Sequence, residues 1–327
     1  MKPLLNLAAA ALMLATTALS APAHAQATDY PTKPIKMVIA FPPGGPTDVN
    51  ARQFAQAMSE TLGQPVVVEN RPGAGGNIAS TAVMGAPNDG YTILYNTSSL
   101  VLGALLYHSA KHDPLKDFAP IARTVATPLV LAVHPSLPVK NVRDLVALAK
   151  KEPGKLNYAS SGAGVIDHLA TAMMATRLDI KIEHVPYKGT APALTDLVGG
   201  NTQMFLTTIN TVLPFVKDKR LTALAVSSRA RSPLLPDVPT LTEATGLNDL
   251  ELTAWNGLVA PAGTPPAIVA KLNAAVNSAL AQPAFQEKMR AMGVEMYGGT
   301  PAEYAAFLAS ETKRLGDAIQ QAGVPKQ

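Results

Sequence analysis

The chain has 327 residues, no cysteine and a formal net charge of +4 at pH 7. The lack of cysteine excludes disulfide bonds, an anchor attached through cysteine and thiolate metal ligands. The charged residues are scattered instead of forming basic blocks, which argues against a nucleic-acid partner.

The first residues have the pattern of a secretory signal peptide. Lys2 precedes an apolar stretch over residues 7–19, and Ala23-His24-Ala25 supplies a small-x-small cleavage motif. The stretch is short for a spanning helix, which needs about 18 apolar residues, although an uncleaved anchor is the alternative. We predict a signal peptide over residues 1–25, cleaved after Ala25, and an exported protein.

The remaining residues alternate between apolar runs typical of strands and segments with helical spacing. Strands are predicted at residues 35–41, 66–69, 92–95, 129–133, 156–160, 181–185, 203–206, 222–226 and 252–260. Helix ends are marked by Gly63 as a C-terminal glycine, Asn141 as an N-cap, and a capping box over residues 300–303. Such alternation predicts an α/β fold on a mainly parallel sheet.

The alternating pattern appears twice, with breaks near residues 119–127 and 233–250. The segment after residue 250 offers only a strand and three helices, so we expect it to complete the first domain. The predicted domains are residues 26–126 with 247–327, and residues 127–246. Two crossings between domains would form a hinge with a cleft. Trp255, the only tryptophan, would lie near the second crossing or fill the core.

The first predicted strand ends at Phe41 and leads into a glycine turn before a helix. The turn, residues 42–48, reads Pro-Pro-Gly-Gly-Pro-Thr-Asp. The first amides of a helix lack intrahelical acceptors and carry the positive end of the helix dipole, which suits an anion. Proline has no N–H, so the available donors are Gly44, Gly45, Thr47 and Asp48. An ordinary turn with Thr47 or Asp48 as N-cap is the alternative.

A similar turn follows the predicted strand at residues 156–160. There, Ser160 and Ser161 add hydroxyl groups to the amides of Gly162 and Gly164. Both turns therefore lie where ligands bind in open α/β sheets, at the carboxyl ends of strands. Capping and flexibility are the alternative roles.

Weaker candidates lie elsewhere. Residues 70–77 place a glycine turn before another helix, and Thr97 and Ser98 follow a strand. Tyr187 offers an aromatic wall and Lys188 a cation, although Lys188 on a solvated loop is the alternative.

The order of these segments resembles the Bug-type periplasmic solute receptors of the tripartite tricarboxylate transporter family. Phe-Pro-Pro-Gly-Gly at residues 41–45, Glu-Asn-Arg-Pro-Gly-Ala-Gly-Gly at 69–76, Val-Pro-Tyr-Lys-Gly at 185–189 and the segment 255–265 carry the resemblance. It implies a two-domain, type II periplasmic-binding fold that closes on a small organic carboxylate. The carboxylate would be held by backbone amides, hydroxyl groups and waters, without a cofactor or chemistry. The partners would be integral-membrane transporter subunits, and we expect a monomer.

Two stretches depart from that family. Val165, Ile166 and Asp167 stand where polar residues are usual, and Leu206-Thr207-Thr208 replaces an acidic or amide residue and a proline. Both stretches would face the cleft. Asp167 would either oppose an amino group of the ligand or extend the helix cap, and we favour the cap.

The predicted ligand-binding residues come mainly from the two glycine turns and the strand ends. They are Phe41, Gly44, Gly45, Thr47, Asp48, Thr97, Ser98, Ser160, Ser161, Gly162, Gly164, His168, Tyr187, Lys188 and Thr207.

An enzyme is the competing class. Ser160 or Ser161 with His168 would supply part of a hydrolase triad, but no Gly-x-Ser-x-Gly elbow frames either serine. The histidines are dispersed, so we predict no metal site. A co-receptor that presents its ligand to a membrane sensor is the other alternative.

Overall fold

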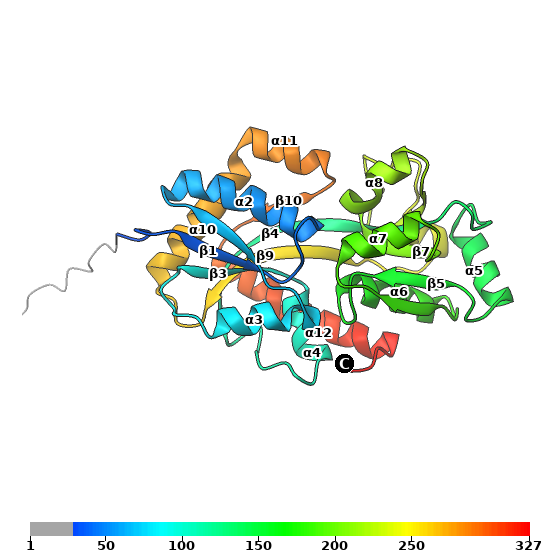
Figure 1. Ribbon diagram of the computed structural model, residues 1–327, viewed down its shortest axis with the longest axis horizontal. Coiled ribbons are helices and arrows are strands. Elements are labelled where there is room, and N and C mark those ends of the chain that lie inside the picture. Colours follow the sequence, from blue (N-terminus) through cyan, green and yellow to red (C-terminus); the bar gives the residue numbers. More distant parts are fainter. Residues whose placement is uncertain (1–28) are drawn as a thin grey trace, which may run out of the picture. The chain divides into compact units, whose positions relative to one another are not determined.

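A ten-stranded mixed sheet runs through the chain between layers of helices (Figure 1). The computed structural model describes residues 29–327, and Lys33–Gln327 form one compact unit. The predicted signal peptide and its cleavage site lie outside the described residues. Among residues 29–327, every helix is too short or too polar to cross a membrane.

The strands are β1 (Ile35–Ile39), β2 (Val66–Asn70), β3 (Thr92–Thr97), β4 (Phe118–Val133), β5 (Asn157–Ser160), β6 (Glu183–Pro186), β7 (Met204–Thr208), β8 (Thr222–Val226), β9 (Thr253–Pro261) and β10 (Glu295–Gly298). The helices are α2 (Pro46–Leu62), α3 (Asn77–Met84), α4 (Ser99–Leu106), α5 (Val142–Lys151), α6 (Ile166–Arg177), α7 (Thr190–Val198), α8 (Ile209–Lys217), α9 (Leu241–Thr245), α10 (Pro266–Ala281), α11 (Pro283–Ala291) and α12 (Pro301–Ala322), with a 3₁₀ turn at Ala74–Gly76.

Strand β4 is much longer than predicted. The sequence pattern indicated a strand only from residue 129, whereas β4 begins at Phe118. Pro120, Arg123 and Pro128 interrupt the apolar pattern, but the strand accommodates this stretch with irregular register against β9 between Pro120 and Val125. The short strand β10 was not predicted at all.

The prediction of a mainly parallel sheet is wrong. Strand β1 is parallel to β2 and β3, and β5 is parallel to β6 and β7. Strand β4, however, is antiparallel to β7, β8, β9 and β10, and β9 is antiparallel to β3. Local periodicity identifies strands but does not give their directions, which depend here on long-range returns of the chain.

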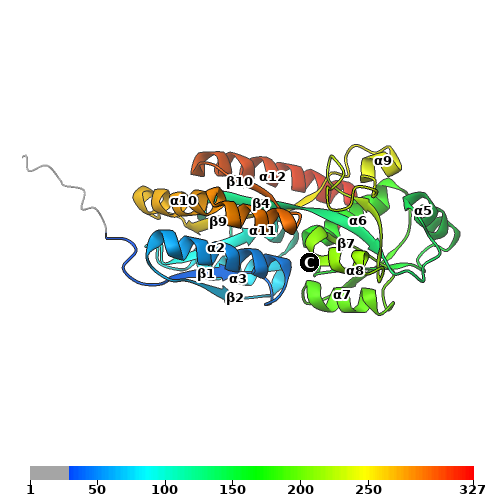
Figure 2. The ribbon, with the colours of Figure 1, turned by 90° about the horizontal axis from the view of Figure 1, so that it is seen from above.

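Strand β4 belongs to two regions of the sheet. Its residues 118–128 pair with β9, and residues 129–133 pair with β7. We call β1, β2, β3, β9, β10 and the start of β4 the first region, and β5 to β8 with the end of β4 the second region. Figure 2 shows β4 passing from one region to the other. The predicted domain boundaries stay a prediction.

Trp255 on β9 is buried, as one of its two predicted roles requires. Its indole Nε1–H donates to Glu311 Oε2 at 2.7 Å, and its ring meets Phe307 edge-on at 5.1 Å. The Glu311 carboxylate also accepts from Arg314, at 2.6 Å to Oε1. The tryptophan is thus fixed to α12 by both packing and a charged acceptor.

Three predicted helix ends are confirmed. Asn141 Oδ1 accepts from the Asp144 amide, Thr300 and Glu303 form a capping box, and Gly63 ends α2 in a left-handed conformation. The alternative role of Thr47 or Asp48 as the N-cap is not what the structure shows. Helix α2 begins at Pro46 with Gly45 as N-cap, because proline has the φ angle that a first helical residue needs.

Gly257→Ala is expected to destabilise the fold, because a Cβ atom at residue 257 would overlap the Tyr304 hydroxyl. That hydroxyl accepts from Asn96 Nδ2 at 2.8 Å in the core. Overpacking of this kind costs about 1–3 kcal/mol. Urea denaturation followed by circular dichroism measures the loss.

Gly316→Ala is the matched control, because its Cβ would meet only Leu105, at 4.0 Å, in the middle of α12. It should leave stability unchanged or raise it by up to about 1 kcal/mol. Equal stability of the two variants would contradict the close packing at Gly257.

Candidate ligand-binding site

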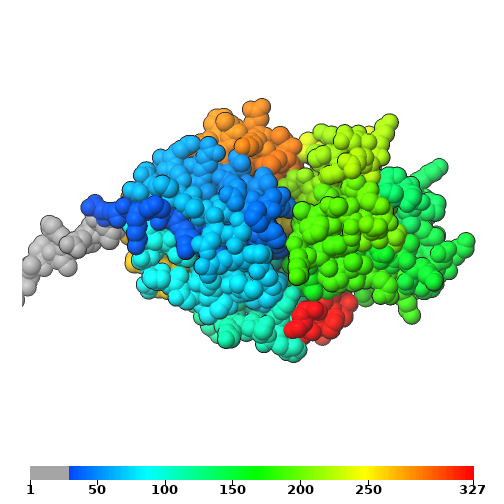
Figure 3. Space-filling view, viewed as in Figure 1, coloured from blue at the N-terminus to red at the C-terminus, as the bar shows by residue number. Residues whose placement is uncertain are grey.

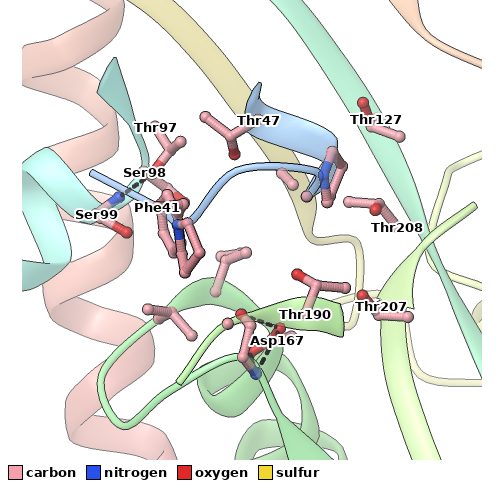
Figure 4. Close-up of a pocket in the computed structure, with 18 of the residues that line it drawn as sticks. Phe41, Thr47, Thr97, Ser98, Ser99, Thr127, Asp167, Thr190, Thr207 and Thr208 are labelled. Carbon is pink, nitrogen blue, oxygen red and sulfur yellow. Dashed lines mark hydrogen bonds between the residues drawn. The ribbon is translucent and has the colours of Figure 1, made fainter. Parts of the chain in front are cut away.

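A cavity lies between the starts of five helices, α2, α4, α6, α7 and α8, with β4, β7 and β9 behind them. About 780 Å³ of space lies between these elements, open solvent at the mouth included. Figure 3 shows the blue surface of α2 meeting the green surface of α7 along a furrow. Figure 4 shows hydroxyl side chains directed into the cavity from both sides.

The structure brings eight of the predicted residues together around this cavity. They come from both sheet regions and are Phe41, Gly45, Thr47, Thr97, Ser98, Ser161, Lys188 and Thr207.

Gly44 and Asp48 do not line the cavity, because they bond to each other. The Gly44 amide, at a left-handed φ of +80°, donates to Asp48 Oδ2 at 3.0 Å. The buried Asp48 carboxylate also accepts from Arg52 Nε and from Asn70 Nδ2, both at 2.9 Å. These bonds satisfy the donor that the sequence had suggested for a ligand, and they fix the shape of the turn.

Ser160, Gly162, Gly164, His168 and Tyr187 also lie outside the lining. Ser160 is buried, and its hydroxyl bonds His184 Nε2 at 2.6 Å. The Gly164 amide donates to His168 Nδ1 at 3.1 Å, and the Tyr187 hydroxyl donates to Asp196 at 2.5 Å. The bonds of Ser160 and Gly164 to the two histidines hold the turn 160–164 in shape.

Several lining residues were not in the predicted set: Asn50, Ser99, Thr127, Val165, Ile166, Asp167, Gly189, Thr190, Thr208, Trp255 and Asn256. Asn50 lies three residues after Thr47, a spacing that puts both side chains on one face of α2. Thr190 directly follows the segment Tyr-Lys-Gly that was singled out. Thr127 lies within the part of β4 that was predicted as a domain connection.

Hydroxyl groups dominate the polar lining. The side chains of Thr47, Thr127, Thr190 and Thr207 hydrogen-bond to no other described residue. Figure 4 shows Thr47 pointing down into the cavity and Thr190 pointing up from the other side. Their hydroxyl groups are therefore available to a ligand as donors or acceptors.

Asn50 adds a buried amide. Its side chain is 2% exposed, and its Oδ1 atom has no hydrogen-bond partner among the described residues. Buried polar atoms are rarely left unpaired in proteins, which makes Oδ1 an unusual atom in this lining residue.

The helix starts supply backbone donors. In α2 the first intrahelical bond is made by the Val49 amide, so the amides of Thr47 and Asp48 have no intrahelical acceptor. Helix α7 begins at the lining residue Thr190. Helix α8 begins at Ile209, directly after the lining residue Thr208. Each such start carries roughly +0.5 of an elementary charge. Together they give one side of the cavity a positive potential with little formal charge.

Two formally charged side chains line the cavity. Lys188 is exposed and forms no ion pair among the described residues. Asp167, in the first turn of α6, is 5% exposed and accepts from Ser161 Oγ at 2.5 Å and from the Ser161 amide at 3.1 Å. Burial raises the pKa of Asp167 to about 6, although the hydrogen bonds from Ser161 act in the opposite direction.

His168 and His184 stack behind the turn 160–164, with ring centroids 4.0 Å apart and planes within 5°. Burial lowers the pKa of each to about 4, and for His168 the neighbouring His184 adds to the effect. Because Ser160 is fully buried against His184, its hydroxyl has no access to a substrate. Ser160 and His184 therefore do not form a hydrolase site.

A larger groove, of about 2200 Å³ counted in the same way, includes Arg123 and Arg314 and shares only Trp255 with the cavity. It contains none of the predicted ligand-binding residues. Among residues 29–327, no three histidine, aspartate or glutamate side chains gather as a metal site.

Comparison with known proteins assigns the family. Residues 50–324 match the tripartite tricarboxylate transporter family receptors. The protein BugT of Bordetella pertussis is 37% identical over 319 residues, which are 97% of this chain and 97% of BugT.

Solved structures agree. Rpa4515 of R. palustris, determined with adipate, superposes with a TM-score of 0.87 at 35% identity, over 90% of this chain and 99% of that one. MatC of Rhodopseudomonas palustris, with bound malate, superposes with a TM-score of 0.84 at 33% identity, over 89% of this chain and 100% of MatC. The chain has the α/β fold of periplasmic binding proteins. It belongs to the tripartite tricarboxylate transporter receptors of the Bug type.

Acid is expected to destabilise the fold through the stacked histidines. Their pKa is about 4 in the folded chain, against about 6.5 when unfolded, so the unfolded chain takes up these protons first as the pH falls. Stability should fall between about pH 6.5 and pH 4. His184→Phe keeps a ring beside Tyr158 but removes one of the two protonation sites, so this variant should lose less stability over this pH range.

Asp167 acts with the opposite sign, because its raised pKa makes the folded chain take up that proton first. Asp167→Asn should therefore steepen the acid loss. Urea denaturation at pH 7 and pH 4.5 gives the free energy of unfolding of the wild-type protein, His184→Phe and Asp167→Asn. An identical pH dependence in all three would contradict the assigned environments.

Proposed function

We propose that this chain is a periplasmic receptor that binds a small organic carboxylate in the cavity between α2 and α7 and delivers it to a tripartite tricarboxylate-type membrane transporter. The observation that carries the proposal is the convergence of helix starts and free hydroxyl groups on one cavity. A carboxylate is the ligand class that such donors favour. The ligands of Rpa4515 and MatC, adipate and malate, are small dicarboxylates, which supports the same class.

The proposed contacts are largely uncharged. The donors are the amides and side chains at Gly45, Thr47, Thr97, Ser98, Ser161 and Thr207, together with Thr190 and Asn50, with Phe41 as an apolar wall and Lys188 at the margin. A micromolar Kd corresponds to about 8 kcal/mol. Hydrogen bonds to a charged group contribute about 1.5–3 kcal/mol each, so four or five of these donors suffice after the entropy of association is subtracted.

Ligand binding is proposed to draw the two predicted domains together. Thr47 belongs to residues 26–126 and Thr190 to residues 127–246, and both line the cavity. A ligand that contacts both favours the closed arrangement by its additional contacts. Small-angle scattering should show a smaller radius of gyration on saturation, and an unchanged profile with tight binding would place the site within one domain.

Export and oligomeric state complete the proposal. We propose cleavage after Ala25 and a monomeric mature chain. Mass spectrometry of the protein isolated from the periplasm gives the first residue, and light scattering gives the mass in solution. An intact N-terminus or a dimer mass would contradict these two points.

Thr47→Val and Thr190→Val should each weaken carboxylate binding by about tenfold to a hundredfold, because each removes one hydroxyl and keeps the side-chain shape. Isothermal titration calorimetry with adipate and malate measures the change. The uncharged diamides of both acids should bind far more weakly than the acids to the wild-type protein.

Thr312→Val is the matched control, since Thr312 lies on α12 and, among residues 29–327, its hydroxyl bonds only the Leu308 carbonyl, at 2.8 Å. It should bind like wild type. Equal affinity for the acids and their diamides would contradict a carboxylate site, and unchanged affinity in both cavity variants would remove the site from this cavity.

A further inference from the structure

The end of α4 makes a direct contact between the two predicted domains. Tyr107 directly follows α4, belongs to residues 26–126 and lies outside the lining of the cavity. Its hydroxyl donates to the Ala163 carbonyl at 2.8 Å, and Ala163 belongs to residues 127–246. Ala163 is two residues from Ser161, which lines the cavity. Tyr107 therefore ties the first predicted domain to a turn that shapes the cavity.

The Tyr107 ring fits between two glycines, one from each predicted domain. A Cβ atom at Gly75 would lie 2.5 Å from Tyr107 Cε2, and a Cβ atom at Gly164 would lie 2.9 Å from the same atom. Both distances are too short for packed atoms, so the ring reaches both backbones only because no side chain is present there. Gly75 comes from the glycine turn at residues 69–76, and Gly164 was predicted to bind the ligand. The contact with Tyr107 gives both glycines a role outside the lining.

The backbone around Tyr107 is fixed within the first predicted domain. The His108 amide donates to the Gln327 carbonyl at 3.1 Å, and the Gln327 amide donates to the Leu106 carbonyl at 2.6 Å. Figure 1 shows the end of α4 beside the end of the chain marked C. Tyr107 is thus a fixed surface feature onto which the turn 160–164 docks.

A second contact joins the same two domains at the cavity. Pro42 lies in the first glycine turn and Gly189 directly precedes α7, and both line the cavity. A Cβ atom at Gly189 would lie 3.0 Å from Pro42 Cγ, so the proline ring closely approaches the Gly189 backbone. The two sides of the cavity are therefore in contact in this structure. Pro42 and Gly189 meet through packing, whereas Tyr107 adds a directional hydrogen bond.

We propose that Tyr107 is a positioning residue that latches the two predicted domains together once a ligand has entered the cavity. This inference rests on the proposed function, although Tyr107 itself does not touch the ligand. When the domains part, the hydroxyl loses the Ala163 carbonyl and the ring loses Gly164. Closure restores both contacts, and contacts present in one state alone shift the equilibrium toward that state. The latch therefore controls how long a ligand stays more than how fast it enters.

Tyr107→Phe tests the latch, because it removes the hydroxyl and keeps the ring. Stopped-flow fluorescence of Trp255, the only tryptophan and a lining residue, gives both rate constants with adipate and with malate. The dissociation rate constant should rise about threefold to tenfold, which is the range that one net hydrogen bond supplies. The association rate constant should change by less than about twofold, because the latch forms after entry. Calorimetry should show Kd raised by the same factor as the dissociation rate constant.

Tyr297→Phe is the matched control, because it makes the same chemical change away from the latch. The Tyr297 hydroxyl donates to Glu295 on the same strand at 3.1 Å, and its ring lies over the Arg123 guanidinium at 3.5 Å. This variant should keep the wild-type rate constants.

The outcomes separate the two proposals. A merely structural role of the Tyr107 hydroxyl would lower the free energy of unfolding in urea and leave both rate constants unchanged. That result overturns the inference and leaves the proposed function standing, and so does an equal rise of the dissociation rate constant in Tyr297→Phe. Failure of both acids to bind the wild-type protein, folded by circular dichroism, overturns the proposed function and this inference with it.

Discussion

Unpaired backbone amides at the starts of helices decide what this cavity can hold. Strands β1, β5 and β7 each end at a turn that leads into a helix, so the starts of α2, α6 and α8 lie around the same space. These donors are fixed by the helices themselves and need no side-chain entropy to position them. Strand β4 keeps the two sets of turns opposite each other, because it pairs with β9 in one sheet region and with β7 in the other. The polarity of the cavity follows from this arrangement.

Helix α6 differs from the other helices at the cavity because its start is already occupied. The Asp167 carboxyl group accepts hydrogen bonds from the Ser161 hydroxyl and amide there, so this helix start is already capped by a side chain of its own first turn. Behind it, the stacked rings of His168 and His184 hold the turn 160–164 from the side away from the cavity. The same few residues therefore shape the site and make its stability sensitive to pH.

Local sequence predicted the parts of the site that local chemistry determines. The turns at residues 42–48 and 160–164 were identified because strand, glycine and helix follow each other directly, and Thr47 and Ser161 came from them. The Gly44 amide was assigned to the ligand, but it donates to Asp48 instead. Asn70, at the end of the neighbouring strand β2, holds that carboxylate in place. Thr127 was missed because Pro120, Arg123 and Pro128 hide the strand that carries it. Strand direction, and hence the mixed sheet, depends on pairings between distant segments that no local pattern contains.

The account is tested most directly by a crystal structure of the protein saturated with adipate or malate. It predicts a ligand carboxylate within hydrogen-bond distance of the Thr47 amide and of the Thr190 hydroxyl, with the cavity otherwise closed around the chain of the ligand. A ligand bound instead among the arginines of the larger groove, beside Arg123 and Arg314, would contradict it. So would a carboxylate held in the cavity by Lys188 alone, with the helix starts left unoccupied.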